Sequence, residues 1–441
     1  MSVPHTQTVR TDSSLVLSFE DARQVVENHA VNVAARGSEF VDLLETAGRV
    51  LAESIIADRD FPPFPRSTRD GYAVRPADVA KLPAVLTVLG EIKAGQKLDE
   101  MPASVEPGQA IAIMTGAPVP AGCDAVVMVE YTSRHGERVE ITRGASAGEN
   151  IVARGAEARQ GGVLLNHGLQ LNHAAIAVAA SVGMTRVNVF KRPRIAILST
   201  GDELVGLDDS PGPTEIRNSN SYSLAVQVRT AGGEPVLLPI APDEPYKLRR
   251  LIEEALQADL LLLTGGVSMG RYDLVEQVLA EIHAEFFFTG VKIQPGRPAV
   301  FGRVPCGPGA PSASSGQAPA REGTSVPLQS KYFFGLPGNP VSTMVTFELF
   351  ARPVLEALMG MTPQKLRFLH ARLKREIRVK TGLKRFLPAI LSGEFENSVV
   401  ELVTWQGSGD IAATARANCY VVIPPDQEQI AAGEFVAVMM R

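Results

Sequence analysis

The chain has 441 residues, more than one hydrophobic core accommodates, so its length predicts roughly two to four domains. Its composition, 45% hydrophobic and 21% charged, is ordinary for a globular protein. The formal net charge of −5 argues against a general nucleic-acid binder, which needs clustered Lys and Arg. The three scattered cysteines, Cys123, Cys306 and Cys419, suggest neither a disulfide framework nor a zinc site and favour a reducing cytoplasm. No apolar run approaches the roughly 20 residues of a membrane span, and the first residues lack a signal-peptide profile.

The N-terminal part of the chain changes character twice. Residues 18–34 predict an amphipathic helix, and residues 39–57 predict a second helix that runs into a strand. The following FPPFP stretch cannot continue a helix, because proline removes backbone donors and fixes φ. Short β-like runs then predict a small β domain over residues 70–148. Residues 149–190 return to a mixed pattern that contains a short apolar helix ended by Gly183.

Between residues 193 and 360, short apolar runs alternate with helical segments. The strands are expected at RIAILS, EPVLLPI, LLLLT, FFFTGVKI, AVFGRV and the run before GLPGNP, and the helices near 221–231, 244–258, 274–283 and 340–359. Asn339 followed by Pro340 is a strong signal for the start of the last helix. This alternation predicts a doubly wound α/β domain with buried parallel strands.

Two other segments have a different composition. Residues 304–330 are rich in Pro, Gly, Ser and Ala, so they cannot bury a core and predict an exposed flexible insertion; a lid is the alternative. From residue 366 onward, short alternating runs predict a second small β domain.

Acidic side chains directly follow the predicted parallel strands. Asp202 and Glu203 come after RIAILS, and Asp243 comes after EPVLLPI. Because the loops after parallel strands converge on one edge of the sheet, we expect these carboxylates to lie near a bound ligand. Paired carboxylates repel an anion unless a cation intervenes, and Mg²⁺ prefers such hard oxygen ligands. Capping of the next helix is the alternative role for one of Asp202 and Glu203, and for Asp243.

The loop TGGVSMGRYD follows the LLLLT strand. Its glycines, Gly265, Gly266 and Gly270, permit a ligand to approach the backbone closely. Ser268 can donate a hydrogen bond to that ligand, and Asp273 can bind a metal or position an attacking oxygen. The loop therefore predicts a phosphate-binding site.

Further candidates lie in two other segments. Pro337, Gly338 and Pro340 shape the turn before the last helix, whose N-terminal dipole favours an anion. Lys292 and Arg297 are the best cations to neutralise an oxyanion, although surface solvation also explains Lys292.

Two residues of the predicted small β domain also occupy turns. Asp70 precedes Gly71 in a tight turn, where capping is its alternative role. Thr115 lies in a turn whose hydroxyl and N–H groups suit an oxyanion, unless the hydroxyl only satisfies the turn itself.

Six motifs in a fixed order carry a family resemblance. They are SxxDGYAV at 67–74, IMTGAPVPAGCDAVVMVE at 113–130, STGDEL at 199–204, TGGVSMGRYD at 264–273, QPGRP at 294–298 and GLPGNPVS at 335–342. From about residue 15 to 441 the chain resembles the molybdopterin molybdenumtransferases of the bacterial MoeA type, which are homologous to the E domain of gephyrin and of its plant counterpart.

The resemblance implies an elongated homodimer whose subunits have four domains. A helix/strand first domain would comprise residues 15–60 and 149–190 and hold an inserted β domain at 61–148. A doubly wound α/β molybdopterin-binding domain would span 191–360, and a C-terminal β domain would span 361–441.

The resemblance also implies an activity. The family takes adenylylated molybdopterin and molybdate, cleaves the adenylate, places molybdenum on the dithiolene sulfurs and releases AMP, with Mg²⁺ as the cofactor. The family's site lies between the α/β domain of one subunit and the DGYA-bearing domain of the other. Molybdopterin adenylyltransferase and molybdoenzyme apoproteins are candidate partners; no nucleic acid or membrane is implied.

Site residues carry over from the matching motifs. The catalytic candidates are Asp70, Thr115, Glu203, Asp243 and Asp273, of which Glu203, Asp243 and Asp273 would also bind the metal. The substrate-binding candidates are Gly265, Gly266, Ser268, Gly270, Lys292, Arg297, Pro337, Gly338 and Pro340, and Glu157 and Asp202 are further candidates.

The chain departs from the family pattern in several positions. Ala156 and Glu157 stand where the family usually has a Glu-Asp pair, Gln294 stands where a lysine is common, and Arg69 replaces an apolar residue. Two other functions remain open: a molybdopterin adenylyltransferase, which would turn over ATP with free molybdopterin, and a scaffold without chemistry, like the clustering role of the gephyrin domain.

Overall fold

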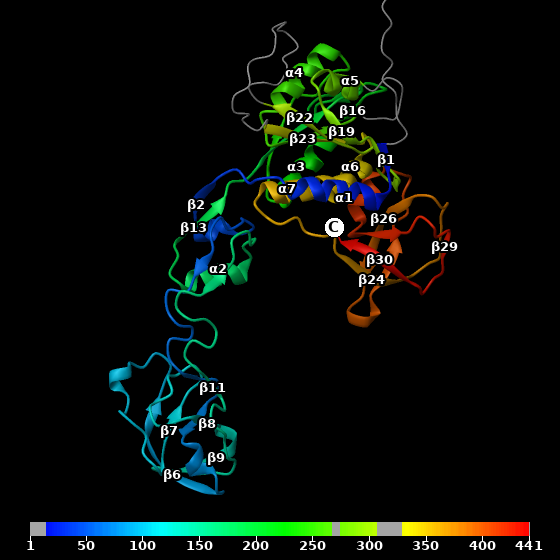
Figure 1. Ribbon diagram of the computed structural model, residues 1–441. Coiled ribbons are helices and arrows are strands. Elements are labelled where there is room, and N and C mark those ends of the chain that lie inside the picture. The colour runs from blue at the N-terminus through cyan, green and yellow to red at the C-terminus, as the bar shows by residue number, and fades with distance from the viewer. Residues whose placement is uncertain (1–14, 267–273, 307–328, 441) are drawn as a thin grey trace, which may run out of the picture. The chain divides into compact units, whose positions relative to one another are not determined.

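The computed structural model describes residues 15–266, 274–306 and 329–440 (Figure 1). The chain splits into two compact units. The larger unit contains the described residues of Met1–Glu39, Gly48–Val50 and Asn188–Arg441, and the smaller unit contains Phe40–Ala47 and Leu51–Val187. Within the described residues, no helix has the length and apolarity needed to cross a membrane.

A six-stranded sheet forms the centre of the larger unit, in the order β17-β14-β18-β23-β22-β19. Its strands are β14 (Arg194–Ser199), β17 (Glu234–Leu237), β18 (Leu260–Thr264), β19 (Glu285–Phe288), β22 (Val300–Cys306) and β23 (Gln329–Leu336). The first four strands in this order are mutually parallel, and β22 runs antiparallel between β23 and β19. The predicted doubly wound α/β domain is therefore confirmed.

The buried strands divide their side chains between two cores. Ile195 and Ile197 of β14 pack into one core, whereas Ala196 and Leu198 pack into the other, because successive strand residues point to opposite faces. All five residues of β18 are buried. Each such leucine stabilises the fold by about 1.5–3 kcal/mol, more than a typical single hydrogen bond contributes.

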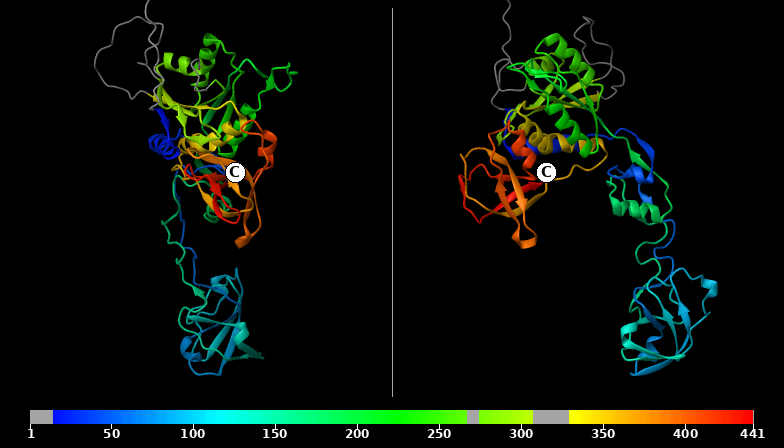
Figure 2. Two further views of the ribbon diagram at one scale, coloured as in Figure 1. Left: turned by 90° about the vertical axis from the view of Figure 1, so that its right-hand side faces the viewer. Right: turned by 180° about the vertical axis from the view of Figure 1, so that it is seen from behind.

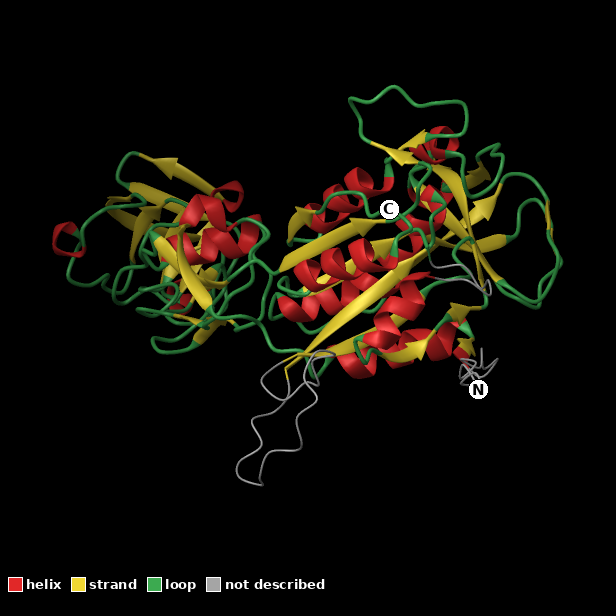
Figure 3. Ribbon diagram, turned by 90° about the horizontal axis from the view of Figure 1, so that it is seen from above, coloured by secondary structure: helices red, strands yellow, loops and turns green. Residues whose placement is uncertain are grey.

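Helices cover both faces of this sheet (Figures 1 and 3). One face carries α1 (Phe19–Ala30), α3 (Asn220–Thr230), α6 (Pro340–Thr346) and α7 (Arg352–Leu358), and the other carries α4 (Pro245–Ala255) and α5 (Leu274–Glu281). The segment 39–57 is not the predicted helix: it holds β2 (Ser38–Asp42), a 3₁₀ turn (Leu43–Thr46) and β3 (Ile55–Ile56). Gly48 at φ +74° interrupts helical geometry there.

The placement of α1 differs from the expected first domain. Phe19, Ala22 and Val26 belong to the same core cluster as the strands of the α/β sheet. Because α1 buries its apolar face against this core, residues 15–39 belong to the larger unit rather than to a separate N-terminal domain.

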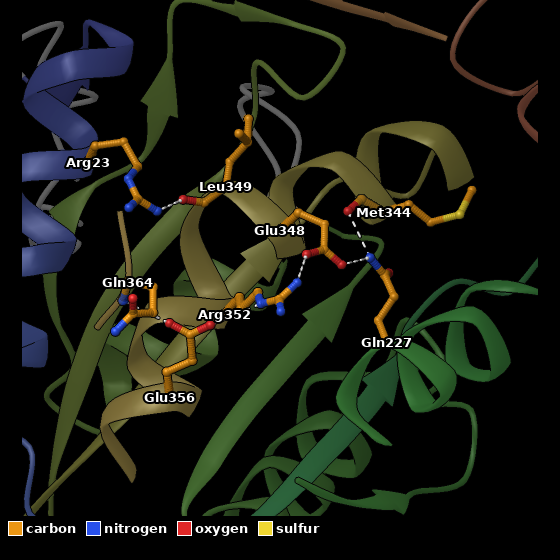
Figure 4. Close-up of polar contacts among 8 residues, drawn as sticks. All are labelled: Arg23, Gln227, Met344, Glu348, Leu349, Arg352, Glu356 and Gln364. Carbon is orange, nitrogen blue, oxygen red and sulfur yellow. Dashed lines mark hydrogen bonds and ion pairs between the residues drawn. The ribbon is translucent and has the colours of Figure 1, made fainter. Parts of the chain in front are cut away.

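A continuous helical segment runs from α6 through a π-helical turn, η6 (Phe347–Ala351), into α7. Figure 4 shows the polar contacts that surround it. Arg352 pairs with Glu348 at 2.8 Å and with Glu356 at 3.0 Å, and Arg23 of α1 donates a hydrogen bond to the Leu349 carbonyl. Gln227 of α3 donates to the Met344 carbonyl at 3.1 Å and to Glu348 at 2.8 Å. These contacts anchor the end of α6, the π-helical turn and α7 to α1 and α3.

The C-terminal strands form a second six-stranded sheet, ordered β21-β26-β27-β24-β30-β28, which closes on itself through pairing of β26 with β28. They are β21 (Ile293–Gln294), β24 (Phe368–Leu373), β26 (Lys384–Ser392), β27 (Val399–Leu402), β28 (Cys419–Ile423) and β30 (Phe435–Met440), beside α8 (Ile411–Arg416). Phe386 and Tyr420 of this sheet join the core cluster that contains α1 and α7. Figure 2 shows the C-terminal sheet, in orange and red, next to the helices of the same unit. The predicted second β domain is confirmed.

The smaller unit contains a third six-stranded sheet, ordered β8-β5-β7-β6-β10-β9. Its strands are β5 (Gly71–Val74), β6 (Ala84–Ile92), β7 (Gln109–Ile113), β8 (Ala125–Met128), β9 (Thr132–His135) and β10 (Arg138–Ile141), all within the predicted small β domain. The unit also contains α2 (His173–Ser181), β3, β4 (Arg66–Ser67), β11 (Ile151–Val152) and β12 (Val163–Leu165). Gly183, at φ +76°, follows α2 as the sequence predicts.

The remaining strands are short. They are β1 (Val16–Leu17), β13 (Arg186–Phe190), β15 (Leu204–Val205), β16 (Ile216–Arg217), β20 (Gly290–Val291), β25 (Ile377–Arg378) and β29 (Gln429–Ile430). The predicted flexible insertion falls mostly outside the described residues, but its ends do not, because Cys306 of β22 lies opposite Gln329 of β23.

The register of β22 and β23 generates a prediction about residues 307–328. Replacing them with Asn-Gly joins two antiparallel strands by a two-residue turn that suits a hairpin. Because loop closure depends only weakly on loop length, we expect the free energy of unfolding to stay within about 1 kcal/mol of wild type. Urea denaturation measures this. A much larger loss, or a folded variant without activity, would give the segment a structural or functional role.

Candidate active site

Three parallel strands end at the same level and direct their following loops to one edge of the sheet. Ser199 of β14 is in register with Thr264 of β18, and Thr264 is in register with Leu336 of β23. The connection after β14 leads to β17 on one side of the sheet and the connection after β18 leads to β19 on the other, so a topological switch point lies between β14 and β18. Ligands of open α/β sheets bind at such points.

The QPGRP turn reaches the same edge. It precedes β22, whose first residue, Val300, pairs with Gly335 near the end of β23. Lys292 and Arg297 are exposed, and Arg297 accepts a backbone hydrogen bond from Val291 at 2.8 Å. Gln294, where the family commonly has a lysine, accepts a hydrogen bond from Arg385 at 2.9 Å. Gln294 thus serves as a hydrogen-bond acceptor for the buried Arg385 of β26.

Close backbone contact explains the two described glycines after β18. Gly265 has φ +87°, and a Cβ there would lie 2.3 Å from the Thr200 carbonyl oxygen. Gly266 has φ +62°, and a Cβ there would lie 2.6 Å from the Thr200 Oγ1. The β14 and β18 turns therefore touch, which requires glycine at both positions.

Asn220, at the start of α3, joins two of the converging loops. Its Nδ2 donates to Thr264 Oγ1 at 2.9 Å and to the Gly338 carbonyl at 2.7 Å. The Pro337 carbonyl accepts hydrogen bonds from the hydroxyls of Thr264 and Thr343. Pro337 and Gly338 are thus held in place by Thr264 of the glycine-rich motif and by Asn220 and Thr343, which lie outside the sequence-predicted site residues.

The start of the last helix is as predicted, with one difference. Asn339 occupies the N-cap position before Pro340, but its side chain makes no capping hydrogen bond. The Val341 N–H donates instead to the Ser408 carbonyl of the C-terminal domain at 3.0 Å. One of the backbone donors expected to face an anion is therefore already used.

The carboxylates after β14 and β17 lie together at this edge. Asp202 Oδ1 accepts a hydrogen bond from the Asp243 backbone N–H at 3.0 Å. Burial, and then the charges of Asp202 and Glu203, raise the pKa of Asp243. A Cβ at Gly201 would lie 2.4 Å from the Glu203 carboxylate, so the Glu203 side chain folds back over the turn. Like charges have accumulated here without a compensating cation from these loops.

The expected binding of Mg²⁺ by these carboxylates stays a prediction. Among residues 15–266, 274–306 and 329–440, no group of three or more His, Cys, Asp or Glu side chains is arranged to hold a metal ion. The predicted third ligand, Asp273, lies outside the described residues, together with Ser268 and Gly270.

Asp70 and Thr115, selected separately from the sequence, are partners in the smaller unit. Asp70 Oδ1 accepts hydrogen bonds from the Thr115 backbone N–H at 2.6 Å and from its hydroxyl at 2.9 Å. These two hydrogen bonds lower the pKa of Asp70, because both stabilise the ionised carboxylate. The residue after Asp70 has to be glycine, because a Cβ at Gly71 would lie 1.9 Å from the Val127 carbonyl oxygen of β8.

Glu157 belongs to the smaller unit as well. Its carboxylate pairs with Arg66 of β4 at 2.8 Å, and its backbone N–H donates to Phe61. Both partners are themselves partly exposed, so the ion pair contributes about 0.2–1 kcal/mol at most. The structure thus gives Glu157 a local partner in its own unit.

The crowding of charge at Asp243 predicts a pH-dependent stability. Replacing it with Asn keeps the backbone N–H and removes one negative charge. Because folding raises the pKa of Asp243, its favourable contribution is complete below the ordinary value of 3.8 and is lost as pH rises through the raised pKa. We expect Asp243→Asn to unfold at a higher Tm than wild type at pH 7, with a difference that shrinks toward pH 4.

Thermal unfolding between pH 4 and pH 8 measures this difference. Asp208→Asn, which changes an exposed carboxylate in the loop after β15, is the matched control and should keep the wild-type profile. A Tm difference between Asp243→Asn and wild type that is absent, or that stays constant over this pH range, would contradict the raised pKa of Asp243.

Family models match almost all of the chain. Residues 17–183 match the MoeA N-terminal region (domain I and II), residues 196–357 match a probable molybdopterin binding domain, and residues 370–440 match the MoeA C-terminal region (domain IV). The loops described above thus follow strands of the second of these regions.

Characterised relatives cover the same length. A molybdopterin molybdenumtransferase of Nostoc sp. is 35% identical over 99% of this chain and 96% of its own. One from Bacillus subtilis is 31% identical over 91% of this chain and 90% of its own. The crystal structure of a molybdopterin biosynthesis moeA protein from Pyrococcus horikoshii OT3 aligns with a TM-score of 0.74 at 28% identity, over 97% of this chain and 100% of that one. This chain therefore belongs to the MoeA family of molybdopterin molybdenumtransferases.

Proposed function

We propose that this protein inserts molybdenum into adenylylated molybdopterin during molybdenum cofactor biosynthesis. The substrates are adenylylated molybdopterin and molybdate, and AMP is released when molybdenum reaches the dithiolene sulfurs. The observation that carries the proposal is the meeting of three turns at one edge of the molybdopterin-binding region, with glycine backbone on one side and carboxylates on the other. Family membership over nearly the full chain supports the same reaction.

The chain's own groups have separate tasks in this proposal. The Gly265 and Gly266 turn lets a phosphate approach the backbone, and the exposed Arg297 neutralises an oxyanion. Asn220 and Thr343 hold the turn around Pro337 and Gly338. Holding both substrates at one edge converts an encounter of two molecules into a local reaction.

Magnesium fits the chemistry of the carboxylates at this edge. Asp202, Glu203 and Asp243 supply hard oxygen ligands. Burial, and then the charges of Asp202 and Glu203, raise the pKa of Asp243, and a bound cation would relieve the repulsion between these charges. When bound, Mg²⁺ would neutralise charge on the phosphate and molybdate oxygens. Glu203 and Asp243 would supply ligands to it, and Asp273, which lies outside the described residues, is the candidate for a further ligand.

The role of Glu203 yields a test of the reaction. Glu203→Gln keeps the size of the side chain and removes its charge, so we expect molybdate-dependent AMP release to fall by roughly two to three decades. The measurement loads purified protein with adenylylated molybdopterin, adds molybdate and Mg²⁺, and follows AMP and protein-bound molybdenum. Asp208→Asn serves as the control with an exposed carboxylate.

The same assay separates the possible failures. Wild-type rates in Glu203→Gln would remove that carboxylate from the mechanism. Absence of molybdate-dependent AMP release in the wild type would overturn the insertase proposal. ATP turnover with free molybdopterin, run in parallel, would instead identify an adenylyltransferase.

We also propose that the protein acts as a cytoplasmic homodimer. If Asp70 and Asp243 serve one reaction from different subunits, mixed dimers of Asp70→Asn and Asp243→Asn keep one intact pair. Mixing the two inactive variants under conditions that exchange subunits should then restore part of the activity, as measured by AMP release. Flat activity after exchange verified by mass spectrometry would contradict it.

A further inference from the structure

Two buried oxygens at the switch point lack a hydrogen-bond partner. Within the described part of the chain, Thr200 Oγ1 and Asn220 Oδ1 are buried and accept or donate no hydrogen bond. Thr200 follows β14 and is only 1% exposed, and Asn220 begins α3. A buried polar atom without a partner costs about 1–3 kcal/mol, so two at one edge call for an explanation.

The hydrogen bonds of the Asn220 side chain determine which kind of group its unpaired oxygen can bind. Both hydrogens of Nδ2 are used, one toward Thr264 Oγ1 and one toward the Gly338 carbonyl. Exchanging the amide oxygen and nitrogen would place the oxygen against the Gly338 carbonyl, where two acceptors repel each other. The oxygen of the Asn220 amide is therefore the atom without a partner, and it can only accept a hydrogen bond.

The two oxygens are linked through the glycine turn. A Cβ at Gly265 would collide with Thr200, and the Cβ position of Gly338 lies 3.5 Å from the Gly265 Cα. Gly338 in turn binds Asn220. Glycine supplies no side chain at either contact, so the described residues of these loops leave both oxygens without a hydrogen-bond partner.

We propose that Thr200 and Asn220 form a subsite for a hydrogen-bond donor of the organic part of the substrate, an N–H or O–H of its heterocycle or sugar. An ionised phosphate or molybdate carries no hydrogen to give to Asn220 Oδ1, so the subsite does not bind the oxyanion. This inference rests on the proposed function, because it concerns how the same edge recognises adenylylated molybdopterin.

Thr200→Val is the discriminating variant. It removes the hydroxyl, keeps the branched shape, and deletes no hydrogen bond between described residues. We expect the urea midpoint of the free protein to be unchanged or raised, the Kd for adenylylated molybdopterin to rise about tenfold, and the Kd for molybdate alone to be unchanged. Calorimetric titration with each of these two probes measures the affinities.

Thr343→Val is the matched control for stability. Thr343 is also fully buried, but its hydroxyl donates to the Pro337 carbonyl, so this variant should lower the urea midpoint. Equal losses of midpoint in both variants would mean that the Thr200 hydroxyl has a structural partner and would overturn the subsite.

Asn220→Asp tests the second residue of the proposed subsite. It keeps an oxygen at Oδ1 but sets a carboxylate oxygen against the Gly338 carbonyl, so both the midpoint and the affinity for adenylylated molybdopterin should fall.

The outcomes separate the subsite from the proposed function. If wild type neither binds nor turns over adenylylated molybdopterin, the proposed function fails. If wild type does so and Thr200→Val binds it equally well, the oxygens serve a bound water and the subsite fails. A weaker affinity of Thr200→Val for molybdate alone would make this an oxyanion site and would also overturn the inference.

Discussion

Contact between the turn after β14 and the turn after β18 is the constraint on which the site depends. A side chain at Gly265 would lie 2.3 Å from the Thr200 carbonyl, so the two turns can meet only through glycine backbone. The buried leucines of β18 hold the strands at the register that creates this contact. The arrangement concentrates backbone groups, rather than side chains, at the point where a phosphate-bearing ligand would bind.

Helix α3 links the turns of the site to the packed core through hydrogen bonds along its length. At one end, Asn220 binds Thr264 and Gly338, and Ser221 forms a buried cluster with Ser199. Further along, Gln227 binds the Met344 carbonyl of α6 (Figure 4). Because each contact satisfies a buried polar group, removing one partner costs more than the hydrogen bond itself contributes.

Function at this edge opposes stability. Burial of Asp243, together with the charges of Asp202 and Glu203, raises the pKa of Asp243 and disfavours the ionised folded state. The buried oxygens of Thr200 and Asn220, which lack a hydrogen-bond partner, also lower the stability of the folded state. Asp70 contrasts with them, since Thr115 supplies two hydrogen bonds to one carboxylate oxygen and lowers its pKa. Sites that bind ligands commonly retain such locally unfavourable groups, and the surrounding core compensates.

The sequence by itself determined the parallel strands, most helix positions and the glycine turns, because apolar runs and turn residues act over a few neighbouring positions. It also selected Asp70 and Thr115, but not their contact, which joins residues 45 positions apart. Only the tertiary structure decided that α1 packs on the α/β core, that residues 39–57 are not one helix, and that Asn220 joins two loops. Those features depend on burial and hydrogen bonds between distant segments, which no local pattern encodes.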